Sequence, residues 1–259
     1  MQESSKLKGL AKIWREVKRP FRQFVWHVMG YHALRNDLLH LIDHSISTAI
    51  LHQKTFPRFK NIHQGQEIVL VATGPTAKDY KRIDSAIHIG VNRAFRLDNI
   101  DLHYLFMHDY SAVKSYIKES HRYKPENCTK FYGEAIPESN MIEANALPYC
   151  TRLQKDSNGK FRFCRWLDSE PIGLAGSVIF AAMQFALWTN PQTIYLVGCD
   201  CSDGHFDGQP NEHSASYLIP SWIQLKEFAQ RYYPETEILS INPVALQGVF
   251  NEKLQRNCP

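Results

Sequence analysis

The stretch EIVLVATGPT at residues 67–76 decides the fold class. An apolar run of this length that ends in a glycine–proline turn is typical of a strand buried on both faces of a sheet. Similar runs, each followed by polar or glycine residues, stand at 86–91, 102–107, 193–197 and 237–241, and a further strand, the fourth in chain order, is expected at 129–132. Helical patterns lie between them, so the sequence predicts an α/β protein with a Rossmann-like, mostly parallel sheet and helices on both faces.

The composition excludes several other classes of protein. The 259 residues are 44% hydrophobic, 22% charged and 12% aromatic, which is too much apolar surface for a disordered chain. No run reaches the roughly 18 apolar residues that span a bilayer. Six cysteines are too few for a disulfide scaffold of this size. These features, and the lack of an apolar signal-peptide core near Met1, predict a cytoplasmic protein.

The positive charge is concentrated at the N-terminus. Residues 1–60 carry eleven Lys and Arg against four Asp and Glu, whereas the remainder is slightly acidic. We therefore expect no nucleic-acid groove over the main domain. Apolar residues at steps of three and four predict that residues 1–64 form a basic amphipathic helical arm. Two interpretations of this arm remain open, one in which it packs on protein, including a second subunit, and one in which residues 1–28 lie on an anionic membrane surface.

The remaining residues, 65–259, are expected to form one ligand-binding α/β domain. Two segments within it have little periodicity, and we expect them to be lid or loop regions: 136–172, which holds three prolines and an insert-like turn, and 200–216, which is polar.

In α/β sheets, ligands bind at the carboxyl ends of the strands. That rule selects Thr73–Thr76, Asn92–Arg93, His108–Asp109, Gly198–Asp200 and Asn242–Pro243.

Two of these places, and the helix start at Gly176, each allow two interpretations. Gly74 could let the backbone approach a phosphate at a helix start with unpaired N–H groups, or it could serve a tight turn. Gly176 and Ser177 could form a second anion site, or Ser177 could cap a core helix. Asn92 could bind a base or ribose, or cap a turn.

A loop histidine is the candidate general base. His213 has an imidazole whose ordinary pKa lets it accept a proton from a hydroxyl at neutral pH. The nearby residues Asp200, Asp203, His205 and Asp207 raise the possibility of a metal ion, but their spacing matches no calcium loop, and no metal is predicted.

These motifs, in their order, resemble the small bacterial sialyltransferases and the related domain of flagellin-modification proteins and of an archaeal pterin pyrophosphokinase. The resemblance covers roughly residues 65–250 and rests on VATGPTAK at 71–78, Asn92, GSV at 176–178, IYLVGCD at 194–200, His213-Ser214 and INP at 241–243. It departs from the sialyltransferase pattern at Thr73, where that family has Asn, and at His108, which replaces the Asn of the third strand.

The resemblance implies a role for each matching residue. His213 would be the general base that deprotonates the acceptor hydroxyl. The residues implied in nucleotide and donor binding are Thr73, Gly74, Pro75, Thr76, Asn92, Arg93, His108, Gly176, Ser177, Asp200, Asn242 and Pro243.

The function that follows from the resemblance is an inverting, metal-independent glycosyltransferase of polysaccharide or lipopolysaccharide biosynthesis. It would need no cofactor and would take a CMP-activated sugar, sialic acid or another, as donor. The acceptor would be a hydroxyl of a surface glycan or of a lipid-linked glycan, which a location at the inner membrane face would suit. A homo-oligomer is compatible with the sequence. The alternative is an ATP-dependent, pyrophosphokinase-like transferase that acts on a pterin.

Overall fold

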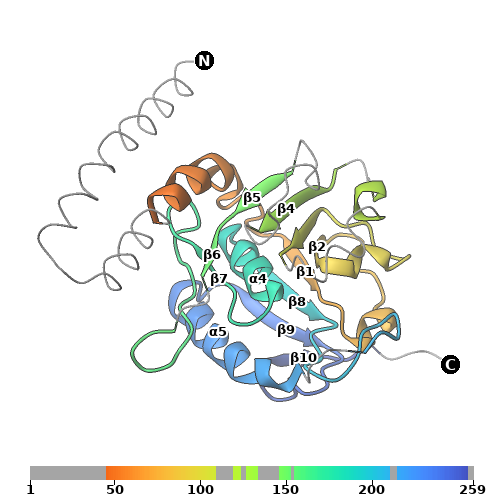
Figure 1. Ribbon diagram of the computed structural model, residues 1–259. Coiled ribbons are helices and arrows are strands. Elements are labelled where there is room, and N and C mark those ends of the chain that lie inside the picture. Colours follow the sequence, from red (N-terminus) through yellow and green to blue (C-terminus); the bar gives the residue numbers. More distant parts are fainter. Residues whose placement is uncertain are drawn as a thin grey trace, which may run out of the picture.

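Eight parallel strands form one sheet in the computed structural model, which describes residues 45–108, 119–123, 127–133, 146–152, 155–210 and 215–255. Their order across the sheet is β10-β9-β8-β1-β2-β3-β4-β5 (Figure 1). The strands are β1 (Glu67–Val71), β2 (Ile87–Val91), β3 (Tyr104–Met107), β4 (Thr129–Gly133), β5 (Leu147–Tyr149), β8 (Thr193–Val197), β9 (Glu237–Ile241) and β10 (Asn251–Lys253). The predicted fold class, an α/β Rossmann-like parallel sheet, is confirmed.

The two central strands are apolar because both of their faces are covered. All five residues of β8 are buried, and β1 is buried from Ile68 onward. The register pairs Glu67 with Thr193 and Val71 with Val197, so the two strands end side by side. The turns that follow them therefore begin at the same edge of the sheet.

Helices cover one face of the sheet. Helix α4 (Val178–Trp188) is buried along its whole length, and α5 (Ile219–Tyr232) buries the side that carries Trp222 and Leu225. The Phe185 ring of α4 packs against the rings of Phe106 and Phe131, with centroids 5.2 and 5.0 Å apart. This aromatic cluster fixes α4, and hence its N-terminal end, on the sheet.

Part of the predicted arm belongs to this core. A helix over 45–55 and the 3₁₀ helix η1 (Pro57–Phe59) precede β1, and Phe56 is fully buried. The Trp188 indole N–H donates to the Phe56 carbonyl oxygen at 3.1 Å. The packed domain thus includes residues that the sequence placed in the arm before residue 65, while residues 1–44 lie outside the described part of the chain.

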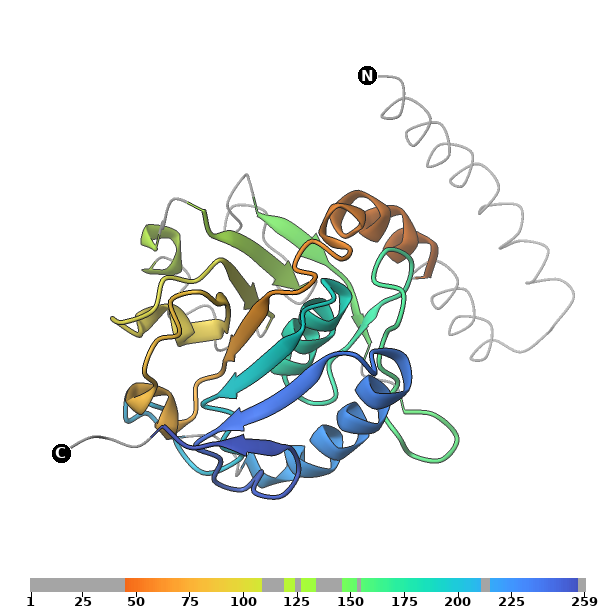
Figure 2. The same cartoon turned by 180° about the vertical axis from the view of Figure 1, so that it is seen from behind.

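The other face is covered by short 3₁₀ helices among the described residues. These are η2 (Pro75–Asp79) and η3 (Asn92–Arg96), seen from behind in Figure 2. We expected an α-helix after Thr76, but η2 ends after five residues because the sequence to Ile83 offers only scattered apolar side chains for burial. Residues 109–118, which follow β3 in the chain, lie outside the described part.

The predicted lid at 136–172 is in part regular structure. Strand β5 extends the main sheet, and β6 (Thr151–Arg152) pairs with β7 (Ile172–Gly173) in a separate two-stranded sheet. The buried Gln184 amide of α4 accepts N–H bonds from Cys164 and Gly173 at 2.6 and 3.1 Å. The described residues of this segment are therefore held on the core, and 136–145 and 153–154 lie outside the description.

No helix in the described residues is both long enough and apolar enough to cross a bilayer.

Candidate functional site

The sheet reverses its strand order between β1 and β8. Strand β1 has β2 on one side and β8 on the other, and the chain continues outward from each. In open α/β sheets such a reversal leaves a crevice outside the carboxyl ends of the strands, where ligands bind. The turns after β1 and β8 line that position.

These two turns are bonded to each other through their backbones. The Gly74 N–H donates to the Gly198 carbonyl oxygen at 2.9 Å. A Cβ atom on Gly74 would lie only 2.5 Å from that oxygen and from Asp200 Oδ2. The close approach requires glycine at position 74. The backbone conformation does not, because the φ of −66° is accessible to any residue.

The Asp200 carboxylate holds the first turn of η2. The Thr76 N–H donates to Asp200 Oδ2 at 2.8 Å, and the Thr76 hydroxyl donates to Oδ1. Asp200 is only 3% exposed, and burial raises the pKa of its carboxyl group although both Thr76 bonds act to lower it. Asp200 is thus a positioning residue for the turn.

The amides at this helix start are already in use. Gly74 donates to Gly198, Pro75 has no N–H, and Thr76 donates to Asp200. The expectation of unpaired N–H groups at Thr76 for a phosphate is therefore wrong. The local sequence could not indicate this hydrogen bond, because Asp200 stands 124 residues further along the chain.

Asn92, the first residue after β2, carries an unsatisfied polar atom. Its backbone has a φ of 47°, and its amide oxygen Oδ1 is buried with no hydrogen-bond partner among the described residues. Leaving a buried acceptor unpaired costs about 1–3 kcal/mol. A donor group of a ligand at the sheet edge would remove that cost.

The loop after β8 folds back over the ends of β1 and β2. We call residues 202–209 the strap; they fall within the predicted loop region 200–216. The Phe206 N–H donates to the Thr73 carbonyl oxygen at 3.0 Å, and His205 Nδ1 lies 3.0 Å from Thr73 Oγ1. The strap thus contacts the turn that follows β1.

Asp207 joins the strap to two arginines, Arg93 and Arg96. Asp207 Oδ2 lies 3.2 Å from Arg93 Nη1 and 3.2 Å from Arg96 Nη1. Burial acts to raise the pKa of Asp207, but the Gln209 N–H and the Arg93 guanidinium outweigh it and hold that pKa below its usual value. Burial also lowers the pKa of His205, which favours a neutral imidazole beside Thr73.

The N-terminal end of α4 is capped by its own residues. Ser177 Oγ accepts the Ile179 N–H at 3.5 Å, as the capping interpretation expected. The Tyr217 hydroxyl donates to the Gly176 carbonyl oxygen at 3.0 Å, and its ring lies over Gly176. Tyr217 is 56% exposed, so one aromatic face stays open to solvent at this end of the helix.

His108 follows β3, and Asn242 follows β9, on either side of the central strands. Gly133 leaves the space that the His108 ring occupies, since a Cβ there would lie 2.0 Å from His108 Nδ1. Asn242 has a φ of 48°, and its side-chain oxygen accepts the Gln255 N–H at 2.9 Å. Pro243 follows it, partly buried.

The structure brings most predicted residues to one edge in a defined order. Across the sheet, the strand ends carry Asn242, Asp200, Thr73, Asn92 and His108 in turn. Hydrogen bonds join Thr76 to Asp200, and the strap contacts both Thr73 and Arg93. His213, the predicted base, and Asp109 lie outside the described residues, so no geometry bears on them.

Arg96 is the contact residue that the sequence reasoning missed. Arg93 and Arg96 stand three apart on the helical turn after β2, a spacing that places two cations on one face. Asp207 had been considered only as a possible metal ligand, and in the structure it binds these arginines. Within the described ranges, no three His, Cys, Asp or Glu side chains group as a metal site would need.

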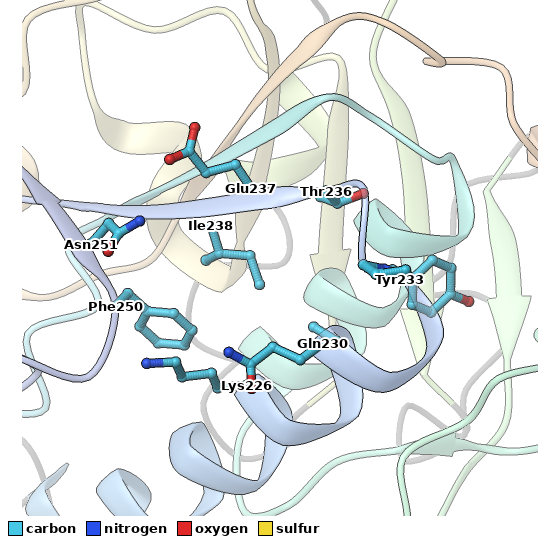
Figure 3. Close-up of a pocket in the computed structure, with 10 residues that line it drawn as sticks. Lys226, Gln230, Tyr233, Thr236, Glu237, Ile238, Phe250 and Asn251 are labelled. Atoms are coloured by element: carbon cyan, nitrogen blue, oxygen red, sulfur yellow. The ribbon is translucent and has the colours of Figure 1, made fainter.

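A cavity of about 270 Å³ lies away from this edge, between α5 and the starts of β9 and β10 (Figure 3). Lys226 and Gln230 of α5 face Phe250 and Ile238 there, and Lys226 Nζ donates to the Val249 carbonyl oxygen. None of the residues predicted from the sequence lines this cavity.

Fold and edge together define a parallel α/β protein whose strand order reverses between β1 and β8. Solved structures that are similar to it include the following three. The MAf glycosyltransferase from Magnetospirillum magneticum AMB-1 is 14% identical, with a TM-score of 0.49, over 82% of this chain and 38% of that one. The sialyltransferase CstII from Campylobacter jejuni, in complex with the substrate analogue CMP-3FNeuAc, is 13% identical, with a TM-score of 0.37, over 68% and 79% of the two chains. A variant of sialyltransferase Cst-II in complex with CMP is 12% identical, with a TM-score of 0.38, over 68% and 81%.

The chain spans well under half the length of the MAf structure. No protein-family model matches the chain, and no curated protein sequence does.

Proposed function

We propose that the protein is a glycosyltransferase that binds a nucleotide-activated sugar, with CMP as the favoured nucleotide, at the crevice between β1 and β8. The observation that carries the proposal is the amide oxygen of Asn92, which is buried at the end of β2, next to β1, and has no hydrogen-bond partner among the described residues. The motif resemblance to the sialyltransferases favours CMP as the nucleotide. A cytosine amino group or a ribose hydroxyl would donate the hydrogen bond that Asn92 Oδ1 lacks.

Arg93 and Arg96 are the proposed phosphate partners. Asp207 bridges the two guanidiniums, and Arg96 is also paired with Glu119, whose Oε2 lies 2.6 Å from Arg96 Nη2. A CMP-sugar carries one phosphodiester charge, which two guanidiniums can balance without a metal ion. We therefore propose that the donor phosphate replaces Asp207 and that the strap moves when the donor binds.

The proposed reaction is a single displacement. The acceptor oxygen forms a bond to the anomeric carbon as the bond from that carbon to the phosphate oxygen breaks, and the electron pair leaves with CMP. The acceptor proton passes to a base, for which His213 is proposed on the sequence alone. One displacement inverts the anomeric centre, and the acceptor is proposed to be a glycan hydroxyl, free or lipid-linked.

A thermal-shift panel tests the nucleotide assignment. CMP, CDP, UDP, GDP, AMP and ATP are each added with Mg²⁺ or with EDTA. A ligand that binds only the folded state raises the melting temperature, and at 100 times its Kd it stabilises by about 2.7 kcal/mol. We expect a shift with CMP that EDTA does not reduce. A shift that needs both ATP and Mg²⁺ would contradict the proposal and favour the pyrophosphokinase alternative.

A further inference from the structure

Alternating cationic and aromatic side chains form a continuous row on the surface. We call Lys60, Arg165, Trp166, Arg231 and Tyr232 the basic–aromatic patch. Lys60 Nζ lies 5.5 Å from the Trp166 ring centroid, and the Arg165 guanidinium lies 4.7 Å from the same ring. Arg165 also lies 4.8 Å from the Tyr232 ring, and Arg231 lies 5.3 Å from it. Each member therefore touches the next.

Three separate segments build this patch at the amino edge of the sheet. Lys60 precedes β1, Trp166 precedes β7, and Tyr232 ends α5. In Figure 2, β8 and β9 run toward the left, and the helix over 45–55 and the C-terminal end of α5 both lie at the right. The patch is thus on the side opposite the candidate donor site.

The charges of the patch are not neutralised by carboxylates. Lys60, Arg165 and Arg231 are exposed, and none of them forms an ion pair within the described part of the chain. Their partners are ring faces, which hold a cation and leave its charge in place. Trp166 is 43% exposed, a large indole surface to leave in water. Cations with exposed indole and phenol rings are suited to an anionic, interfacial surface.

The charge of the adjoining sequence decides between possible occupants. Residues 1–44 carry eight Lys and Arg against four Asp and Glu and lead into the helix over 45–55. A basic segment would be repelled by a basic patch, so residues 1–44 are a poor cover for it. Both would instead be attracted to the same anionic surface.

We propose that the basic–aromatic patch binds the anionic face of a phospholipid bilayer, with Trp166 and Tyr232 at the headgroup level. This orientation does not depend on the proposed function. It turns the carboxyl edge of the sheet away from the bilayer by at least the length of a strand, about 17 Å for five residues.

Partition of the full chain between buffer and vesicles tests the proposal. Vesicles of 70% phosphatidylcholine and 30% phosphatidylserine are compared with pure phosphatidylcholine by co-sedimentation. The variant Lys60→Gln/Arg165→Gln/Arg231→Gln should lose about fivefold in partition per charge, roughly 100-fold in total. The matched control Lys78→Gln/Lys81→Gln/Lys253→Gln removes three exposed cations near the other edge and should change partition by less than fivefold.

Three outcomes would overturn the proposal. The two triple variants could lose equal affinity, which would assign binding to net charge or to residues 1–28 alone. The wild type could bind both vesicles equally. The patch could instead bind a soluble acidic polysaccharide through the same three cations without binding vesicles, which would identify a glycan as its occupant.

A second measurement keeps the test valid if the triple variant does not fold. Brominated phosphatidylcholine, mixed with 30% phosphatidylserine, quenches indoles that enter the headgroup region. Quenching of the wild type should fall markedly in Trp166→Phe at equal protein bound. Unchanged quenching in Trp166→Phe would place the bilayer contact elsewhere.

Discussion

At the residue scale, the candidate site depends on a few atoms that the fold forces together. Gly74 brings the two central turns into contact, and Asp200 locks the first of them through Thr76. Asn92 is different, because its buried Oδ1 has no protein partner in the described residues. Gly74 and Asp200 shape the two central turns, and Asn92 Oδ1 is the acceptor proposed to bind the ligand.

Gly74→Ala should destabilise the protein and abolish the nucleotide-induced thermal shift. The added Cβ would lie 2.5 Å from a backbone oxygen, which cannot rotate away, so the turns must separate. Overpacking of this kind costs roughly 1–3 kcal/mol. Urea unfolding and the nucleotide shift measure the two effects.

The control for this change is Gly248→Ala. Gly248 has a φ of 73° and open space around its Cβ position, so its substitution strains the backbone without a clash. It should lower stability by about 1–2 kcal/mol and leave the nucleotide shift intact. Equal nucleotide shifts in Gly74→Ala and the wild type would refute the role given to the turn.

At the element scale, the strap is the part of the edge that we propose the donor displaces. Its hold on the sheet consists of backbone and side-chain bonds to Thr73 and of the two ion pairs of Asp207. Partly exposed ion pairs contribute less than about 1 kcal/mol each. The strap can therefore open without unfolding the domain.

Asp207→Asn should tighten nucleotide binding several-fold, because the wild-type carboxylate competes with the ligand phosphate for Arg93 and Arg96. Isothermal titration calorimetry gives the Kd, and Asp203→Asn is the matched control, being an exposed carboxylate of the same strap. Weaker binding in Asp207→Asn would mean that Asp207 helps to hold the ligand.

At the scale of the whole molecule, sequence patterns predicted the sheet better than its surroundings. Strands β8 and β9 have the predicted bounds because their apolar runs end in clear turn residues. Strand β5 was missed, since Pro148 in a three-residue strand gives no pattern. The burial of Phe56 could not be predicted either, because helical periodicity shows an apolar side but not what it packs on.

For the candidate site, too, the sequence predicted some features and not others. The strand-end rule predicted which residues stand at the carboxyl edge of the sheet, because it depends only on where the apolar runs stop. Their bonds join Thr76 to Asp200 and Arg93 to Asp207 across 124 and 114 residues, and no local pattern records such pairings.

The stability of the molecule should fall as the pH drops below 6.5. His88 is fully buried in β2, where burial first, then Arg82 and His103, lower its pKa to about 4. The unfolded chain, with an ordinary histidine pKa, binds more protons between pH 6.5 and 4, so protonation favours unfolding in that window. The loss is roughly 2 kcal/mol at pH 5 and absent above pH 6.5.

Urea unfolding at pH 7.5 and pH 5.0 checks this dependence. His88→Gln removes the titrating group and should reduce the difference between the two free energies of unfolding, whatever its effect at pH 7.5. If His88→Gln kept the full difference, the pH dependence would belong to other groups.

The most direct test is calorimetric binding of CMP to the wild type, Asn92→Gly and Asn190→Gly. Asn92 and Asn190 both have a positive φ, of 47° and 58°, so glycine strains neither backbone, but only Asn92 lies at the candidate site. We predict that Asn92→Gly weakens CMP binding about tenfold, by one lost hydrogen bond, while Asn190→Gly binds like the wild type. Equal affinity in all three proteins, or no binding of CMP to the wild type, would contradict a nucleotide-sugar site at the reversal between β1 and β8.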